Sequence, residues 1–281
     1  EYTTSLVGNQ FVWIPCTPAE YIKTSWGMVY GGYDAESGAG AEMMQVAKYG
    51  GFYVARYEAG LADTITEYTG NQVSNGSNSP SYNVAGIPKS KAGELPWIFI
   101  SQTNSKKSAE NMYNTDEKHS DYVTSGLITG TQWDVMLNRF IGTTNENGVT
   151  FTETDMKNSS KWGNYYDNTL TYTGRSATLF RSNGSGYISP WGAKQTNATT
   201  GTYTEYTTGA SKKTEAYHTY DVAGNVQEWT EEVGQGTGYR VFRGGSCYGA
   251  SGSEPACYRA GHCTVSSVHF DVGFRAVLYI K

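Results

Sequence analysis

The sequence is poor in the residues that build several common kinds of site. Its 281 residues include only four cysteines, four histidines and seven prolines. Four cysteines are too few for a disulfide framework in a chain of this length, and without a Cys-x-x-Cys pair a structural zinc site is not expected. No histidines have a metal-ligand spacing such as His-Glu-x-x-His. The residues concerned are Cys16, Cys247, Cys257 and Cys263, with His119, His218, His262 and His269.

Charge and long apolar runs are also scarce. Charged residues make up 17 % of the chain and the net charge is −5, which argues against a nucleic-acid partner because phosphate binding needs clustered Lys and Arg. No apolar run approaches the roughly 20 residues that span a bilayer. No secretion signal is recognisable; the sequence starts at Glu1 rather than Met, which leaves open that a targeting segment was removed.

Tyrosine and glycine are abundant, with 23 and 34 residues. A surface rich in Tyr, Gly, Ser, Thr and Asn is typical of adaptable binding faces, although long extracellular loops have the same composition. Short apolar runs predict strands at residues 11–15, 52–58, 239–242 and 275–280. The chain therefore indicates a loop-rich α+β domain.

Two main helices are predicted. Residues 101–113 place Ala109, Met112 and Tyr113 on one face. A second helix begins after Thr129, which forms a capping box with Gln132. Its apolar stripe predicts four core side chains, Trp133, Met136, Leu137 and Phe140.

The remaining stretches predict loops within one domain, residues 1–281. Residues 60–95 indicate an insertion loop, and residues 142–217 have almost no regular pattern. This second stretch holds Asn-x-Ser/Thr sites such as Asn183 and Asn197, which its composition alone can explain. The glycine cluster at 234–238 predicts a hairpin loop rather than a phosphate site, because no helix follows it.

Residues 243–275 have an unusual composition. Glu, Lys, Gln, Met and Trp supply 49 of the first 242 residues but only Glu254 among these 33, where nearly seven would be expected. No codon that ends in a pyrimidine encodes any of these five types. A tight, glycine-rich loop region that excludes long side chains is the alternative explanation.

Several motifs in order resemble the formylglycine-generating-enzyme (sulfatase-modifying factor) family. They are Phe-Val-Trp-Ile-Pro (11–15), Phe-Tyr-Val-Ala-Arg-Tyr-Glu (52–58), Gly-Leu-Ile-Thr-Gly-Thr-Gln-Trp (126–133), Pro-Trp-Gly (190–192), Asp-Val-Ala-Gly-Asn-Val-Gln-Glu-Trp (221–229), Arg-Gly-Gly-Ser (243–246) and Gly-Phe-Arg (273–275). The resemblance implies an elaborated C-type-lectin-like fold over nearly the whole chain.

The family's enzymes oxidise a substrate cysteine with copper(I) held by two cysteines at the third and eighth places after Arg-Gly-Gly-Ser. Here these places are Gly249 and Glu254, and the nearby cysteines are out of register, either free or paired as a disulfide. The iron-binding histidines of related oxygenases belong to an additional domain that this sequence lacks. The resemblance also implies a possible structural calcium ion, the one cofactor expected, with four ligands: Asp221, Gly224, Val226 and Glu228. In the alternative, the two carboxylates only hydrogen-bond the loop backbone.

The variable proteins of diversity-generating retroelements are one branch of this fold, and this sequence resembles them in a further respect. There, randomised adenines turn AAC or AAT codons into any codon ending in a pyrimidine, which matches the missing residue types. The resemblance implies a ligand-binding face of variable residues, with Arg243 and Arg275 holding the loops from inside. The expected face comprises Cys247, Tyr248, Ala250, Ser251, Ser253, His262, Thr264, Val265, Ser267, His269, Phe270 and Asp271.

The resulting hypothesis is a non-enzymatic binding protein, of receptor or adhesion type, on a bacterial cell surface or a phage virion. Its partner would be a protein or glycan on a cell or host surface. Two alternatives stay open: a non-varied lectin-like surface or phage structural domain, and a copper-dependent formylglycine-generating oxidase.

Overall fold

The computed structural model describes most of the chain. The described residues are 8–24, 26, 29–30, 41–64, 82–115, 118–169, 179–181 and 204–281. The sites at Asn183 and Asn197 and the Pro-Trp-Gly motif lie outside these ranges, as does the middle of the 60–95 insertion.

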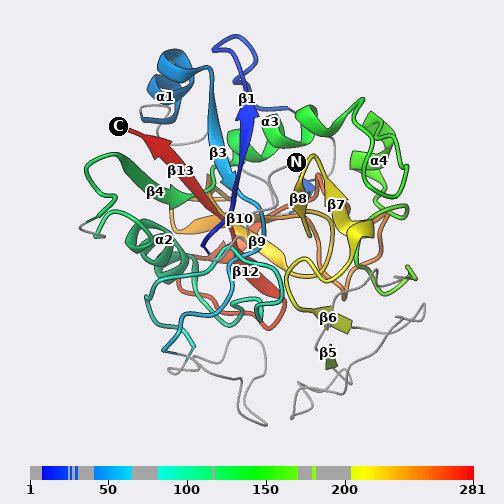
Figure 1. Ribbon diagram of the computed structural model, residues 1–281. Coiled ribbons are helices and arrows are strands. Elements are labelled where there is room, and N and C mark those ends of the chain that lie inside the picture. The colour runs from blue at the N-terminus through cyan, green and yellow to red at the C-terminus, as the bar shows by residue number, and fades with distance from the viewer. Residues whose placement is uncertain are drawn as a thin grey trace.

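The first and last strands meet in one four-stranded sheet. Its order is β1 (Phe11–Pro15), β3 (Gly51–Ala55), β13 (Ala276–Ile280) and β4 (Val123–Leu127). Neighbours are antiparallel, and Figure 1 shows the red β13 crossing the molecule beside the blue strands. Val12 and Ile14 point inward, as the alternation in the sequence predicts. The predicted strand at 52–58 is shorter in the structure, because the chain leaves the sheet after Ala55.

A five-stranded sheet carries the C-terminal motifs. Its order is β12 (Val272–Phe274), β9 (Gln227–Val233), β10 (Tyr239–Arg243), β11 (Arg259–Thr264) and β2 (Val29–Tyr30). The loop at 234–238 joins antiparallel β9 and β10, which confirms the predicted hairpin. Residues 243–275 contain two of these strands, although their sequence has no strand periodicity. Two further two-stranded ladders pair β5 (Leu179–Arg181) with β6 (Thr204–Tyr206) and β7 (Glu215–Ala216) with β8 (Thr219–Tyr220).

Both predicted helices are present, as α2 (Gln102–Asn111) and α3 (Gly130–Phe140). The capping box forms as expected. The backbone N–H of Gln132 donates to Thr129 Oγ1 at 3.1 Å, and the backbone N–H of Thr129 donates to Gln132 Oε1 at 3.0 Å. The whole stripe from Trp133 to Phe140 is buried, so Trp133 is a core residue.

The sequence interpretation missed two shorter helices, α1 (Ala41–Tyr49) and α4 (Glu153–Lys157). A signal for α1 was present, because Ala, Glu, Met and Gln favour helix. Gly50 also ends it in the left-handed region (φ 75°) and donates its N–H to the Val46 carbonyl at 2.8 Å. None of the helices in the described part of the chain is long and apolar enough to cross a membrane.

Candidate ligand-binding face

Residues 243–275 run from the end of β10 to the start of β13 and are held at both ends by buried arginines. At the first end, Arg243 donates to Asp134 Oδ1 at 2.6 Å and to the Tyr258 carbonyl at 2.9 Å. Arg259 donates to the other Asp134 oxygen at 2.7 Å and forms a 2.8 Å ion pair with Glu232. All four charged side chains of this ion network are fully buried.

At the second end, Arg275 is fully buried. Its guanidinium donates to Glu228 at 2.6 Å and to the carbonyls of Ala55 and Tyr220 at 2.9 and 2.8 Å. These bonds connect the start of β13 to β9 and to the first sheet. The prediction that Arg243 and Arg275 hold the loops from inside is confirmed.

Glycine shapes the turn that follows β10. Gly244 and Gly245 have φ values of 90° and 68°. A Cβ on Gly245 would lie 1.9 Å from the Glu254 carbonyl oxygen, so only glycine allows this approach. The turn therefore lies directly against the loop that carries Glu254.

The side chains expected on the face divide into two groups. Most are exposed or half-buried, but Cys247 (0 % exposed) and Ser251 (4 %) point inward. Ser251 donates its hydroxyl to Asp167 at 3.0 Å. The expectation that these two residues are displayed is wrong, because both belong to the framework under the face. The ten that reach the surface are Tyr248, Ala250, Ser253, His262, Thr264, Val265, Ser267, His269, Phe270 and Asp271.

The face has apolar and polar parts. The rings of Tyr248 and Phe270 meet edge to face, with centroids 4.6 Å apart. At the end of β11, the hydroxyls of Thr264 and Ser267 lie 2.8 Å apart. Burial lowers the pKa of His262 and of His269, so both imidazoles are neutral at pH 7. The face thus offers an aromatic edge beside neutral hydrogen-bonding groups.

All four cysteines are free and buried. Burial raises the pKa of Cys16, Cys257 and Cys263 to about 11, and the pKa of Cys247 rises well above its usual value. These are protonated thiols at neutral pH, whereas copper(I) binds thiolates.

The positions of the enzymes' two cysteines are neighbours in space. A Cβ on Gly249 would lie 2.4 Å from Glu254 Oε2. Gly249 and Glu254 therefore occupy, side by side, the places that the enzymes fill with thiolates. Burial, reinforced by the charge of Asp271, raises the pKa of Glu254 to about 7, and burial raises the pKa of Asp271 to about 6. Where thiolates are expected in an oxidase, this chain has a carboxyl group.

The four residues expected to bind calcium do not fit that ion. Asp221 accepts hydrogen bonds from the Thr214 hydroxyl and the Gly209 N–H, both at 2.6 Å, and Glu228 is held by Arg275. Since protein donors already occupy both carboxylates, they lack the free oxygens that calcium needs. Across the described ranges, no group of three or more His, Cys, Asp or Glu side chains could hold a metal.

Instead, the 221–229 segment is organised around Asn225. Its side-chain Nδ2 donates to Glu58 Oε2 at 2.6 Å. Its side-chain Oδ1 accepts from the Tyr206 backbone N–H at 2.8 Å and from the Asn164 side chain at 2.9 Å. Asn225 has φ 62°, in the left-handed region that asparagine tolerates. These hydrogen bonds fix the conformation of the segment and so position β9, which follows it.

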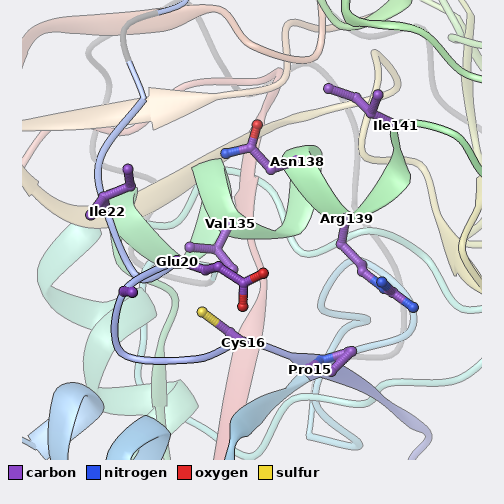
Figure 2. A pocket seen from close by; sticks show the side chains of 9 residues that line it. Pro15, Cys16, Glu20, Ile22, Val135, Asn138, Arg139 and Ile141 are labelled. Carbon is purple, nitrogen blue, oxygen red and sulfur yellow. The ribbon is translucent and has the colours of Figure 1, made fainter.

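A separate hollow of about 360 Å³ lies against α3, and Figure 2 shows the Cys16 thiol and the Glu20 carboxylate on the same side of it. Glu20 accepts from the Thr17 N–H and hydroxyl. No residue of 243–275 lines this hollow, so it is distinct from the face. Its lining is Pro15, Cys16, Ala19, Glu20, Ile22, Val135, Asn138, Arg139 and Ile141.

The sheets, the helices and the held loops define an α+β domain of C-type-lectin-like type that carries a loop face on its last strands. The chain belongs to the family of sulfatase-modifying factor enzyme 1-like domains, whose family profile matches residues 10–280. The expected fold is thereby confirmed.

Two solved structures are similar to the chain at low identity. The crystal structure of CarF matches 98 % of this chain and all of its own, with 14 % identity and a TM-score of 0.47. The Treponema denticola variable protein 1 matches over 81 % of this chain and 95 % of its own, with 15 % identity and a TM-score of 0.35. No curated protein sequence matches the chain.

Proposed function

We propose that this protein is a non-enzymatic binding protein whose residues 243–275 are diversified by a retroelement and displayed on a rigid scaffold. The observation that carries the proposal is the division of this stretch. Fully buried Arg243, Arg259 and Arg275 hold its framework, and ten of the twelve side chains expected on the face reach the surface.

The composition of the stretch supports the same proposal. The five residue types that a pyrimidine-ending codon cannot encode occur once in 33 residues. Steric exclusion does not account for this absence on its own, because Ser253, His262 and Thr264 are exposed and leave room for longer side chains.

The ligand we propose is a protein or glycan on a cell or host surface. Aromatic side chains such as Tyr248 and Phe270 are effective anchors in interfaces, and Ser, Thr and His supply adaptable hydrogen bonds. A bacterial cell surface or a phage virion is the matching location.

The neighbouring DNA tests diversification. We expect a second copy of the repeat that encodes residues 243–280, differing only at adenines and lying beside a reverse-transcriptase gene. If both are absent, the diversification is refuted, and a non-varied surface or structural domain takes its place.

Family membership makes a copper-dependent oxidase the competing function. The protein, incubated with copper and oxygen, should leave a cysteine-containing peptide unoxidised, because Gly249 and Glu254 replace the thiolate pair. Oxidation that disappears in Cys257→Ala would establish the enzyme instead; Cys16→Ala, a buried cysteine remote in sequence, is the matched control.

A further inference from the structure

The hollow against α3 is bordered by two residues of opposite charge. Glu20 belongs to the turn that follows β1, and Arg139 to the last turn of α3. Figure 2 shows both side chains extending toward the side of α3 on which β1 ends. In the part of the chain that the structure describes, neither forms an ion pair, with the other or with a third residue. The two charges therefore face one hollow without neutralising each other.

The Glu20 carboxylate is oriented by a neutral partner. Its Oε2 atom accepts from the Thr17 backbone N–H at 2.8 Å and from the Thr17 hydroxyl at 2.7 Å, while Oε1 has no hydrogen bond to a described residue. The hydrogen bonds from Thr17, together with the charge of Arg139, lower the pKa of Glu20. The carboxylate is thus ionised at neutral pH and keeps one oxygen for a donor.

The Arg139 guanidinium is held in a similar way. It lies over the Tyr217 ring, 4.8 Å from the ring centroid, and Nη2 donates to the Tyr217 hydroxyl at 3.3 Å. Tyr217 itself packs against the hydrophobic core. The other guanidinium N–H groups have no partner among the described residues. Because stacking already restricts the side chain, a ligand that binds it costs less conformational entropy.

The wall of the hollow is apolar. Ile22 is 59 % exposed and Ile141 36 % exposed, and Val135 lies between α3 and the turn after β1. Cys16 is a protonated thiol that donates to the Thr17 carbonyl at 3.2 Å, so it adds no charge. The volume of about 360 Å³ is within the usual range for small-molecule pockets. A ligand that covers Ile22 and Ile141 removes apolar surface from water.

These three features select one kind of ligand. A molecule with only a cationic group meets the repulsion of Arg139, and one with only an anionic group meets that of Glu20. A molecule that carries an ammonium and a carboxylate together gives each charge its partner. An aliphatic substituent beside them matches the isoleucine side chains. An α-amino acid has all three groups on one carbon atom.

We propose that the hollow against α3 binds a free α-amino acid with an aliphatic side chain. Glu20 takes the α-ammonium group, Arg139 takes the α-carboxylate, and the side chain lies against Ile22 and Ile141. No residue of 243–275 lines this hollow, so the site is separate from the ligand-binding face. It does not depend on the proposed function, because a varied and a non-varied binding protein would both contain it.

Titration with L-leucine, followed by the NMR shifts of the Ile22 and Ile141 methyl groups, tests the proposal. We expect saturable shifts with a Kd on the order of millimolar, as for two exposed ion pairs and a small apolar contact. The matched probes are 4-methylpentanoate, which lacks the ammonium group, and 3-methylbutylamine, which lacks the carboxylate. Each should bind at least about fivefold more weakly, because it loses one ion pair and meets one repelling charge.

Two exposed positions supply the variants. Glu20→Gln and Arg139→Gln should each raise the Kd for leucine by about two- to fivefold, the effect of one exposed ion pair. Glu153→Gln on α4 and Lys48→Gln on α1 are the matched controls, exposed charges outside the hollow, and should leave the Kd unchanged.

Ile22→Ser is a third variant, read out through the Ile141 methyl group, and keeps the test valid if Arg139→Gln disturbs the fold. It should also weaken leucine binding, because it removes part of the apolar wall. Absence of saturable shifts with leucine, equal binding of either matched probe, or an unchanged Kd in Glu20→Gln would each overturn the proposal. The neighbouring DNA has no bearing on this outcome, so its failure and the failure of the proposed function are distinguishable.

Discussion

The buried ion network joins four elements through single side chains. Asp134 comes from α3, Glu232 from β9, Arg243 from β10 and Arg259 from β11. Lys23 adds a fifth contact to Glu232 at 2.6 Å. Because the four core members are fully buried, the loss of any one leaves the opposite charges only partly compensated in a medium of low polarity.

Arg243→Ala should therefore lower the free energy of unfolding by about 3–5 kcal/mol, since Asp134 keeps only part of its partners. Arg240→Ala on the same strand is the matched control. Arg240 bonds the backbone carbonyls of Thr237 and Tyr239, and its loss should cost less than about 1 kcal/mol. Urea unfolding measures both, and equal losses would show that the network does not stabilise the fold.

The carboxyl groups of Glu254 and Asp271 predict a pH dependence of stability. The pKa of Glu254 is raised to about 7 and that of Asp271 to about 6, so the folded protein binds more protons than the unfolded chain. The contribution of these groups to stability is therefore greatest below the unfolded pKa of about 4 and declines as pH rises toward 7.

Glu254→Gln should make the decline between pH 5 and 8 shallower, because the amide does not titrate. Unfolding free energies from urea titrations across this range supply the measurement, and Glu153→Gln, which changes an exposed carboxylate on α4, is the control. The same slope for wild type and Glu254→Gln would contradict the assigned pKa shift.

Helix α3 connects the recognisable sequence pattern to the face. Its apolar stripe enters the core, Asp134 holds two arginines, and the Trp133 indole N–H donates to the Ala256 carbonyl at 3.0 Å. Ala256 lies in the loop between β10 and β11. Helix α3 therefore holds both Arg243, at the start of residues 243–275, and the loop that follows it.

Loss of the cap should weaken this connection. Thr129→Ala removes the side-chain oxygen that accepts the Gln132 N–H, and should lower the free energy of unfolding by about 1 kcal/mol. Thr154→Ala, at an exposed position of α4, should change it by less than about 0.5 kcal/mol. Thermal or urea unfolding distinguishes the two; no difference would mean that packing alone determines where α3 begins.

The two sheets tie the far ends of the chain into one scaffold. β13 lies between β3 and β4, and β12 lies at the edge of the second sheet beside β9 (Figure 1). Residues 243–275 are therefore bounded by strands on both sides. Exposed positions between such strands can vary without disturbing the core, because they contribute little buried area.

A combined substitution tests this separation of face and framework. Ser253→Tyr, His262→Tyr and Thr264→Tyr together should change the free energy of unfolding by less than about 1.5 kcal/mol, about 0.5 at each exposed position. Ser251→Tyr, which forces a large ring into a buried site, should cost about 1–3 kcal/mol alone. If the triple variant loses more stability than Ser251→Tyr, the three positions belong to the framework.

Local patterns predicted the two longest helices, α2 and α3, and four of the strands, β1, β3, β10 and β13. The capping box at Thr129, the stripe from Trp133 to Phe140 and the alternation in β1 each depend on residues a few positions apart. The inward roles of Arg243 and Arg275 followed from the family resemblance. Among the strands that were missed, β9 is buried along almost its whole length and so does not alternate, the first three residues of β11 are all buried, and β12 has only three residues.

The sequence by itself determined the family, the fold class and the main helices, and it singled out the stretch that we propose as the ligand-binding face. Glu254, the one residue of the five depleted types in this stretch, was also evident from the sequence, but nothing in the sequence showed which residues lie beside it. Only the tertiary structure decided that Cys247 and Ser251 face inward, that Arg275 and Thr214 occupy the expected calcium carboxylates, and that Glu254 meets Asp271 and Gln227. The reason is physical: burial and pairing depend on contacts between segments far apart in the chain, which no local spacing encodes.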